Sequence, residues 1–449
     1  MRIHLIAIGG AAMHNIALAL HQNGHQVSGS DDEIYNPAKA RLAAAGLLPE
    51  TEGWHPERIH SDIDIVILGM HARADNPELK RALDLGLKVR SYPAFMYEHA
   101  RNKTRMVIAG SHGKTTTTAM TMHVLRKLGI DFDYLVGAQL EGFETMVRLS
   151  DAPVLIVEGD EYLSSCLEPV SKMVQYRPHY AVITGIAWDH VNVFPKFEDY
   201  CAQFGMFMDH IEPGGNLFWY GRDQEIQKLL DARKGSKQFE DQAFTGFEAS
   251  VENGQMFIHL PNQSPVPVQF FGAHNLLNAK AAFHLCNQLG VTATDFVAQI
   301  ADFKGAAKRL QQLAQTEHSI TWLDFAHAPS KARATVVAVK ALYPTRKLTA
   351  CLELHTFSSL NKAFLPQYQG ALNGADQAFV FYSPHTLEMK RMPPISAEEI
   401  RQAFGHPNLE VITETDGLQA RLKAQNWLDR NLLLMSSGTF GGMDLKKII

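Results

Sequence analysis

The first hundred residues alternate short apolar runs with helical stretches. Residues 3–8 and 26–30 are predicted strands with a helix at 15–23 between them, and residues 63–68 are a further strand. A strand, a helix and a strand in this order usually pair their strands in parallel, so the pattern predicts a parallel sheet with helices on its faces. The polar stretch at 98–104 is the expected linker to a second unit.

The same alternation continues along the rest of the chain. Strands are expected at 105–109, 154–157 and 180–184, in a β-rich insertion at 261–271, and at 321–325, 348–353, 377–382 and 431–435. The predicted fold class is therefore α/β with three domains, each built on a mainly parallel sheet. We expect these domains at residues 1–103, 104–306 and 307–449.

Composition narrows the class of protein. At 449 residues the chain exceeds what one hydrophobic core usually supports, which agrees with several domains. A net charge of -5 argues against general nucleic-acid binding. The sequence has no run of apolar residues long enough to cross a bilayer and no signal peptide at its first residues, so we expect a cytoplasmic protein without membrane insertion. Its four cysteines are too widely spaced to suggest a disulfide framework or a zinc site.

The strongest local signal is a glycine turn between an apolar strand and a helix. The turn reads Gly110, Ser111, His112, Gly113, Lys114, Thr115, Thr116. Backbone N–H groups at a helix start attract phosphate, and glycines let the chain approach it closely. We expect Lys114 to neutralise phosphate charge and the Thr115 hydroxyl to bind Mg²⁺. Ile108 stands where a strict P-loop has its first glycine, and the alternative is an ordinary glycine turn.

Acidic side chains follow the next predicted strands. Glu158, Asp160 and Glu161 come at and just after the end of one strand, and Asp189 and His190 follow the end of another. Open α/β sheets bind ligands at the carboxyl ends of their strands, and carboxylates suit magnesium. The alternatives are a solvated acidic turn and a structural histidine.

Together, the glycine turn, the Glu158 group and the Asp189-His190 pair resemble the Mur ligases, a family that includes folylpolyglutamate synthase. The resemblance continues through Phe271 to Ala282, Lys308 to Leu310 and Leu323 to Pro329. It implies a Rossmann-like UDP-binding domain, a P-loop ATP-binding domain and a Rossmann-like C-terminal domain, with ATP as co-substrate and Mg²⁺ as cofactor. The implied catalytic residues are Lys114, Glu158 and His190, and the implied metal ligands are Thr115, Glu158 and His190. The implied ATP-binding residues are Gly110, Ser111, His112, Gly113, Lys114, Thr115, Thr116, His274, Asn275, Asn278, Arg309, Asp324 and His327.

The N-terminal segment resembles the UDP-binding loop of those Mur ligases that start from the free carboxylate of UDP-N-acetylmuramate. Two glycines follow a strand and precede a helix, which leaves backbone N–H groups for a pyrophosphate, although Ala12 stands where a glycine is usual. Asp31 ends the next strand, where a carboxylate could accept a hydrogen bond from a ribose hydroxyl. The UDP-sugar-binding residues expected from this resemblance are Gly9, Gly10, Ala11, Ala12, Met13, Asp31, His71 and Arg73.

Two kinds of Mur ligase share that N-terminal domain, and they differ in the amine that they add. Tyr162 and the ending from Met435 to Gly442 resemble the enzymes that add the cell-wall tripeptide L-alanyl-γ-D-glutamyl-meso-diaminopimelate through an acyl phosphate, in peptidoglycan recycling. L-Alanine is the alternative amine, and a nucleotide-binding regulatory protein without ligase activity is an alternative of another class.

Three segments depart from the family pattern: 163–168, 184–187 and 354–358. His355 stands where the tripeptide enzymes carry an arginine, so Lys362, Lys390 or Arg391 are candidates to bind the carboxylates of the amine substrate. The alternative is that all three are solvated surface cations. The sequence leaves open the peptide specificity, the base that deprotonates the amine and the oligomeric state.

Overall fold

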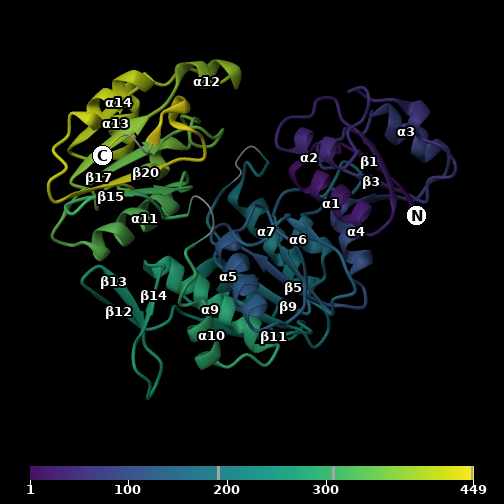
Figure 1. Cartoon of the computed structure of the whole chain (residues 1–449), viewed down its shortest axis with the longest axis horizontal. Coiled ribbons are helices and arrows are strands. Elements are labelled where there is room, and N and C mark those ends of the chain that lie inside the picture. Colours follow the sequence, from purple (N-terminus) through teal and green to yellow (C-terminus); the bar gives the residue numbers. More distant parts are fainter. Residues whose placement is uncertain (190–192, 306–308, 446–447, 449) are drawn as a thin grey trace. The chain divides into compact units, whose positions relative to one another are not determined.

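The computed structural model describes residues 1–189, 193–305, 309–445 and 448 (Figure 1). Contacts divide the chain into two compact units. The first comprises Met1–Ile186, Glu198–Thr245 and Ala281–Val291, and the second comprises Ala187–Phe197, Gly246–Lys280 and Thr292–Ile449. Within the described residues, no helix is both long and apolar enough to cross a membrane.

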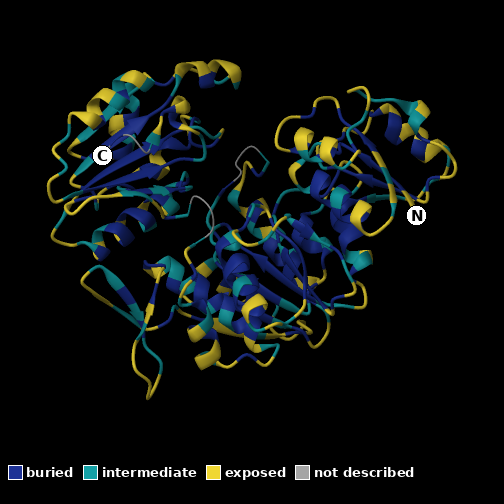
Figure 2. Ribbon diagram, viewed as in Figure 1, coloured by how far each residue is buried: buried dark blue, intermediate teal, exposed yellow. Residues whose placement is uncertain are grey.

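The N-terminal sheet of the first unit is parallel, with strand order β2-β1-β3-β4. Its strand β3 is buried on both faces, as expected where helices cover a parallel sheet (Figure 2). Ile6 of β1 pairs with Ser30 of β2 and Leu68 of β3, so these strands end together and their following loops share one edge. The elements are β1 (Arg2–Ile6), α1 (Ala11–Gln22), β2 (Gln26–Ser30), α2 (Ala38–Ala44), β3 (Ile65–Leu68), α3 (Pro77–Asp84), β4 (Val89–Ser91) and α4 (Tyr92–His99).

The second sheet of the first unit has the strand order β11-β10-β9-β5-β8-β6-β7, parallel except for β7. Ile108 of the central strand β5 pairs with Glu158 of β8, and Ala109 pairs with Ile183 of β9. The loops after β5, β8 and β9 therefore meet at one carboxyl edge. The elements are β5 (Thr104–Ala109), α5 (Lys114–Lys127), β6 (Asp133–Leu135), β7 (Val147–Arg148), β8 (Val154–Glu158), α6 (Lys172–Gln175), β9 (Tyr180–Ile183), α7 (Phe197–Asp209), β10 (Asn216–Tyr220), α8 (Gln224–Asp231) and β11 (Glu240–Phe244).

The second unit contains a three-stranded antiparallel sheet and a six-stranded sheet with the order β15-β16-β20-β17-β18-β19. Only β15 is antiparallel in the larger sheet. The strands are β12 (Ala249–Glu252), β13 (Gln255–Ile258), β14 (Val266–Val268), β15 (Gln311–Gln315), β16 (Ile320–Asp324), β17 (Lys347–Glu353), β18 (Gln377–Phe381), β19 (Leu409–Ile412) and β20 (Arg430–Met435). The helices are α9 (Ala273–Asn287, which continues into the first unit), α10 (Ala293–Ile300), α11 (Pro329–Leu342), α12 (Pro384–Met389), α13 (Ala397–Phe404) and α14 (Thr415–Lys423), and short 3-10 helices cover Pro56–Arg58, Leu365–Tyr368 and Phe440–Gly442.

The predicted α/β class with mainly parallel sheets is confirmed. The β-rich insertion begins at Ala249, earlier than predicted, because the additional strand β12 forms a tight hairpin with β13. Asn253 and Gly254 both have positive φ there, at 49° and 78°, which suits a two-residue turn. The domain bounds stay predictions, and the bound between 306 and 307 falls outside the described residues.

Candidate active site

The glycine turn after β5 is held against the end of β9. Gly110 has a φ of +129°, and a Cβ atom there would lie 2.9 Å from the backbone nitrogen of Thr184. The N–H of Ser111 donates to the carbonyl of Gly185 at 2.9 Å, and the Thr184 hydroxyl donates to the carbonyl of His112. Thr184, which departs from the family pattern, therefore fixes the turn. Gly113, at a φ of 83°, precedes α5 and frees its first N–H groups for a ligand.

Lys114 folds back along this turn toward a buried carboxylate. Its Nζ donates to the carbonyl of Gly110 at 2.6 Å and to Glu161 Oε2 at 2.7 Å. Glu161 is fully buried, and it also accepts the Tyr200 hydroxyl at 3.0 Å. Burial lowers the pKa of Lys114, but the charge of Glu161 and then of Asp160 outweighs it, so the net shift is upward. The ammonium therefore stays charged at the start of α5.

Thr115 and Glu158 form a small oxygen cluster beside Lys114. The Thr115 hydroxyl donates to Glu158 Oε1 at 2.7 Å, and the N–H of Gly137 donates to Oε2 at 2.8 Å. A hydroxyl and a carboxylate suit Mg²⁺, which binds proteins through few ligands and takes the rest from phosphates and water. No group of three His, Cys, Asp or Glu side chains able to hold a metal occurs in the described part of the chain. His190, the third expected metal ligand, lies outside the described residues.

Asp160, the third acidic residue after β8, pairs with a lysine of α6 and not with Lys114 or Thr115. Its Oδ2 accepts Lys172 Nζ at 2.7 Å, and Lys172 also lies 5.7 Å from the ring centroid of Tyr162. Sequence reasoning missed Lys172 and Tyr200, which fix the acids after β8. No local motif marks either residue, because each reaches the site only through the tertiary fold.

The residues expected to bind adenosine lie in the second unit. Asn275 Nδ2 donates to the carbonyl of Phe271 at 3.0 Å, and Asn278 Nδ2 donates to Asn275 Oδ1 at 3.3 Å. Burial lowers the pKa of His274; the charge of Asp324 opposes this shift, and the charge of Arg309 adds to it. Asp324, at the end of β16, accepts the Thr335 hydroxyl at 2.6 Å. Lys308, next to Arg309, lies outside the described residues.

Lys331 of α11 pairs with Asp189, and the charges of both act on His327. Lys331 Nζ lies 3.7 Å from Asp189 Oδ2. Burial, with the charge of Lys331 added, lowers the pKa of His327 to about 4. His327 Nδ1 lies 3.0 Å from the carbonyl of Phe325, which fixes the ring at the edge of the sheet. At neutral pH His327 is therefore an uncharged group.

The N-terminal glycine loop has a carboxylate in contact with its backbone. The N–H of Gly9 donates to Asp31 Oδ2 at 2.7 Å. Burial, with Asp32 beside it, raises the pKa of Asp31 to about 7. Helix α1 begins directly after Gly10, so Ala11, Ala12 and Met13 form its first turn. His71 and Arg73 are exposed on the loop after β3.

The three candidates for binding the amine substrate differ in their surroundings. Lys362 is paired with Glu399 at 2.8 Å, on the surface. Lys390 lies 4.3 Å from the ring centroid of Phe357, which follows β17 in the same loop as His355. Arg391 is next to Lys390 and has a φ of 53°.

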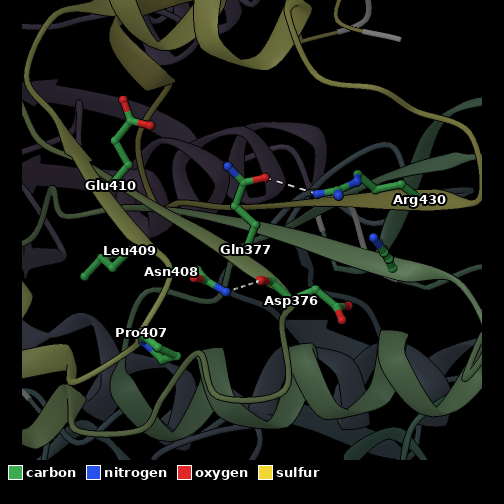
Figure 3. Close-up of a pocket in the computed structure, with 8 residues that line it drawn as sticks. Asp376, Gln377, Pro407, Asn408, Leu409, Glu410 and Arg430 are labelled. Atoms are coloured by element: carbon green, nitrogen blue, oxygen red, sulfur yellow. Dashed lines mark hydrogen bonds between the residues drawn. The ribbon is translucent and has the colours of Figure 1, made fainter.

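A cavity of about 600 Å³ lies at the opposite, amino edge of the six-stranded sheet (Figure 3). None of the expected site residues lines it. Its acids already have partners, because Asp376 pairs with Lys340 at 3.0 Å and Glu410 with Arg421 at 2.8 Å. Arg430 donates to Gln377 at 3.1 Å across the cavity wall. The cavity is therefore separate from the candidate site residues of the first unit, which lie at the carboxyl edge where β5, β8 and β9 end.

Two protein-family models match the sequence. The Mur ligase middle domain matches residues 108–286, and the Mur ligase family, catalytic domain, matches residues 2–104. The chain is 30% identical to the UDP-N-acetylmuramate--L-alanine ligase of Lactiplantibacillus plantarum, over 93% of this chain and 92% of that protein. It is 27% identical to the UDP-N-acetylmuramate--L-alanyl-gamma-D-glutamyl-meso-2,6-diaminoheptandioate ligase of Haemophilus influenzae, over 99% of this chain and 98% of that protein.

Solved structures agree on the fold. The structure of a murein peptide ligase from Psychrobacter arcticus gives a TM-score of 0.66 at 23% identity and covers 100% of this chain and 99% of that one. The UDP-N-acetylmuramate-alanine ligase from Thermotoga maritima gives 0.69 at 20% identity, covering 98% of this chain and 97% of that one. The similarity to both kinds of ligase is comparable, so it does not distinguish between their amine substrates.

Proposed function

Because the chain belongs to the Mur ligase family, whose members form amide bonds with ATP, we propose that it joins the carboxylate of UDP-N-acetylmuramate to the amine of L-alanyl-γ-D-glutamyl-meso-diaminopimelate. This is the activity of murein peptide ligases, and it would serve peptidoglycan recycling in the cytoplasm. The observation that carries the ligase chemistry is the meeting of Lys114, Thr115 and Glu158 at the start of α5.

The proposed reaction begins with activation, because a carboxylate is a poor electrophile. The muramoyl carboxylate attacks the γ-phosphorus of ATP, which gives an acyl phosphate and ADP. The amine then attacks the acyl carbon, and phosphate leaves from the tetrahedral intermediate. Positioning and charge stabilisation supply most of the catalysis in phosphoryl transfer.

The residues of this chain take distinct parts in that proposal. Lys114 would turn from Glu161 to the phosphates, and the N–H groups at the start of α5 would hold phosphate oxygens. Thr115 and Glu158, with His190 as a further ligand, would hold Mg²⁺, which supplies positive charge to the phosphoryl group. Each of these residues binds or orients a reacting group.

The two nucleotides would bind at different loops. For ATP, the adenosine would contact His274, Asn275, Asn278, Arg309, Asp324 and His327, while Gly110 to Thr116 surround the phosphates. For the UDP-sugar, Gly9 to Met13, Asp31, His71 and Arg73 would form the site. Asp31 supports this assignment because its carboxylate holds the Gly9 N–H and so orders the glycine loop.

The tripeptide is proposed over L-alanine because Tyr162 and the C-terminal ending resemble the tripeptide enzymes. A peptide with several carboxylates also needs cations. Lys390, held on Phe357 beside the His355 loop, is better placed for this than Lys362, whose charge Glu399 already neutralises.

ADP release with a panel of amines tests the proposal. The panel runs from L-alanine through L-alanyl-γ-D-glutamate to the tripeptide, with UDP-N-acetylmuramate and ATP held saturating. We expect the tripeptide to give the highest kcat/KM. A preference for L-alanine alone would make the chain an L-alanine-adding ligase. Nucleotide binding without ADP release on any amine would favour the regulatory protein instead.

A further inference from the structure

Arg41, in helix α2, has a positive charge that no carboxylate neutralises within the described residues. Its Nη2 donates to the side-chain oxygen of Gln139 at 3.1 Å, and its Nη1 lies 3.5 Å from that of Asn15. Both acceptors are neutral amides. A half-buried guanidinium with five donors is normally matched by an anion, so this one is available to bind an anionic group.

The position of Arg41 connects the two expected substrate loops of the first unit. On one side, Asn15 lies in the second turn of α1, and its Nδ2 donates to the carbonyl of Ala11 at 2.9 Å. On the other side, Gln139 is two residues from Gly137, whose N–H holds Glu158. Arg41 therefore contacts both the helix that begins at the N-terminal glycine loop and the segment that continues to the Thr115–Glu158 cluster.

The residues around Arg41 leave its positive charge available and hold its neighbours in place. His14, which is buried in α1, has its pKa lowered by burial and by the charge of Arg41, against a smaller opposing effect of its hydrogen bond to the Gly10 carbonyl. His14 is therefore a neutral group that does not compete for an anion. Met146 N donates to Asn15 Oδ1 at 3.2 Å, which ties the segment after Gln139 to α1 and so fixes both neighbours of the guanidinium.

We propose that Arg41 binds the carboxylate of the muramoyl group and so selects UDP-N-acetylmuramate over UDP-sugars that lack it. The inference rests on the proposed function. A UDP-sugar whose diphosphate lies at the start of α1 must extend its carboxylate toward Lys114 and Glu158, and Arg41 contacts a residue near each end of that path. The planar guanidinium matches a carboxylate with two parallel hydrogen bonds, which lysine cannot reproduce.

Calorimetric binding of three ligands tests this without the ligase reaction. UDP, UDP-N-acetylglucosamine and UDP-N-acetylmuramate are titrated into the wild-type protein, Arg41→Gln and Lys39→Gln. Lys39 is the matched control, because it lies on the same helix but is exposed and paired with Glu52 at 3.0 Å. We expect Arg41→Gln to lose roughly tenfold or more in affinity for UDP-N-acetylmuramate alone, the size of a lost charged hydrogen bond. Lys39→Gln should bind all three ligands as the wild type does.

Three other outcomes are decisive. If Arg41→Gln weakens all three ligands equally, Arg41 serves the diphosphate or the fold, and the carboxylate assignment is wrong. If the variant keeps the wild-type preference for UDP-N-acetylmuramate, the inference fails while the proposed function stands. If the wild type binds none of the three, the proposed function itself fails, and this inference fails with it. Arg41→Lys should keep only part of the preference, since it retains charge but not the planar geometry.

Discussion

Replacing Lys114 with methionine removes the cation that faces the fully buried carboxylate of Glu161. The side chain of Lys114 is itself only 14% exposed, so water cannot take its place. Breaking a buried pair by removing one partner typically costs roughly 3–5 kcal/mol. We expect the lower end, about 3 kcal/mol, because the Tyr200 hydroxyl still donates to Glu161.

Urea unfolding of the nucleotide-free protein, with ADP release measured in parallel, separates stability from chemistry. Lys114→Met should lose both stability and turnover. Adding Glu161→Gln should restore most of the stability, because a neutral amide needs no cation, while turnover stays absent. Lys228→Met is the control, since its pair with Glu225 is exposed to solvent and should contribute little to stability.

Two results would refute this reasoning. A double variant as unstable as Lys114→Met would mean that the buried charge of Glu161 is not the cause of the loss. A Lys114→Met protein that ligates at near the wild-type rate would mean that the glycine turn does not bind the phosphates of ATP.

Three further predictions concern single positions. Gly110→Ala should abolish ATP binding in a calorimetric titration, because its Cβ would lie 2.9 Å from Thr184 N at a φ of +129°; unchanged affinity would contradict this. Glu158→Gln should raise the Mg²⁺ concentration for half-maximal ADP release by roughly tenfold or more, and an unchanged requirement would remove Glu158 from the metal site. The pKa of His327 is lowered from 6.5 to about 4, so the unfolded chain binds more protons in that interval, and stability is lost as the pH falls through it. His327→Gln should flatten this pH dependence in urea titrations; an equally steep slope would assign it to other groups.

The sequence predicted those features that local pattern determines. Alternating apolar runs gave the parallel sheets, and the glycine turn followed by Lys114 and Thr115 identified one face of the candidate site. Glu158 was found because it ends a buried strand at the same edge. These signals are contained within about ten residues of chain, so no tertiary information is needed to read them.

Other parts of the candidate site could not be predicted, because distant segments form them. Tyr200 and Lys172 reach the acids after β8 from helices α7 and α6. Thr184 looked like a loss of family pattern, whereas it holds the glycine turn. Arg41 lies in an exposed, alanine-rich helix that no motif marks. The hairpin at Ala249 was missed because its strands are short and only partly buried.

The central position of β20 has a consequence for how the chain folds during synthesis. β20 pairs with β16 on one side and β17 on the other, although it is the last of the six strands to be translated. Until residues 430–435 leave the ribosome, β16 and β17 lack the strand that joins them, and their apolar edges stay open to other chains. A chain cut before Arg430 would therefore lose the middle of the sheet rather than its border. We expect such a product to aggregate or be degraded, while the sheets formed by residues 2–91 and 104–244 still assemble.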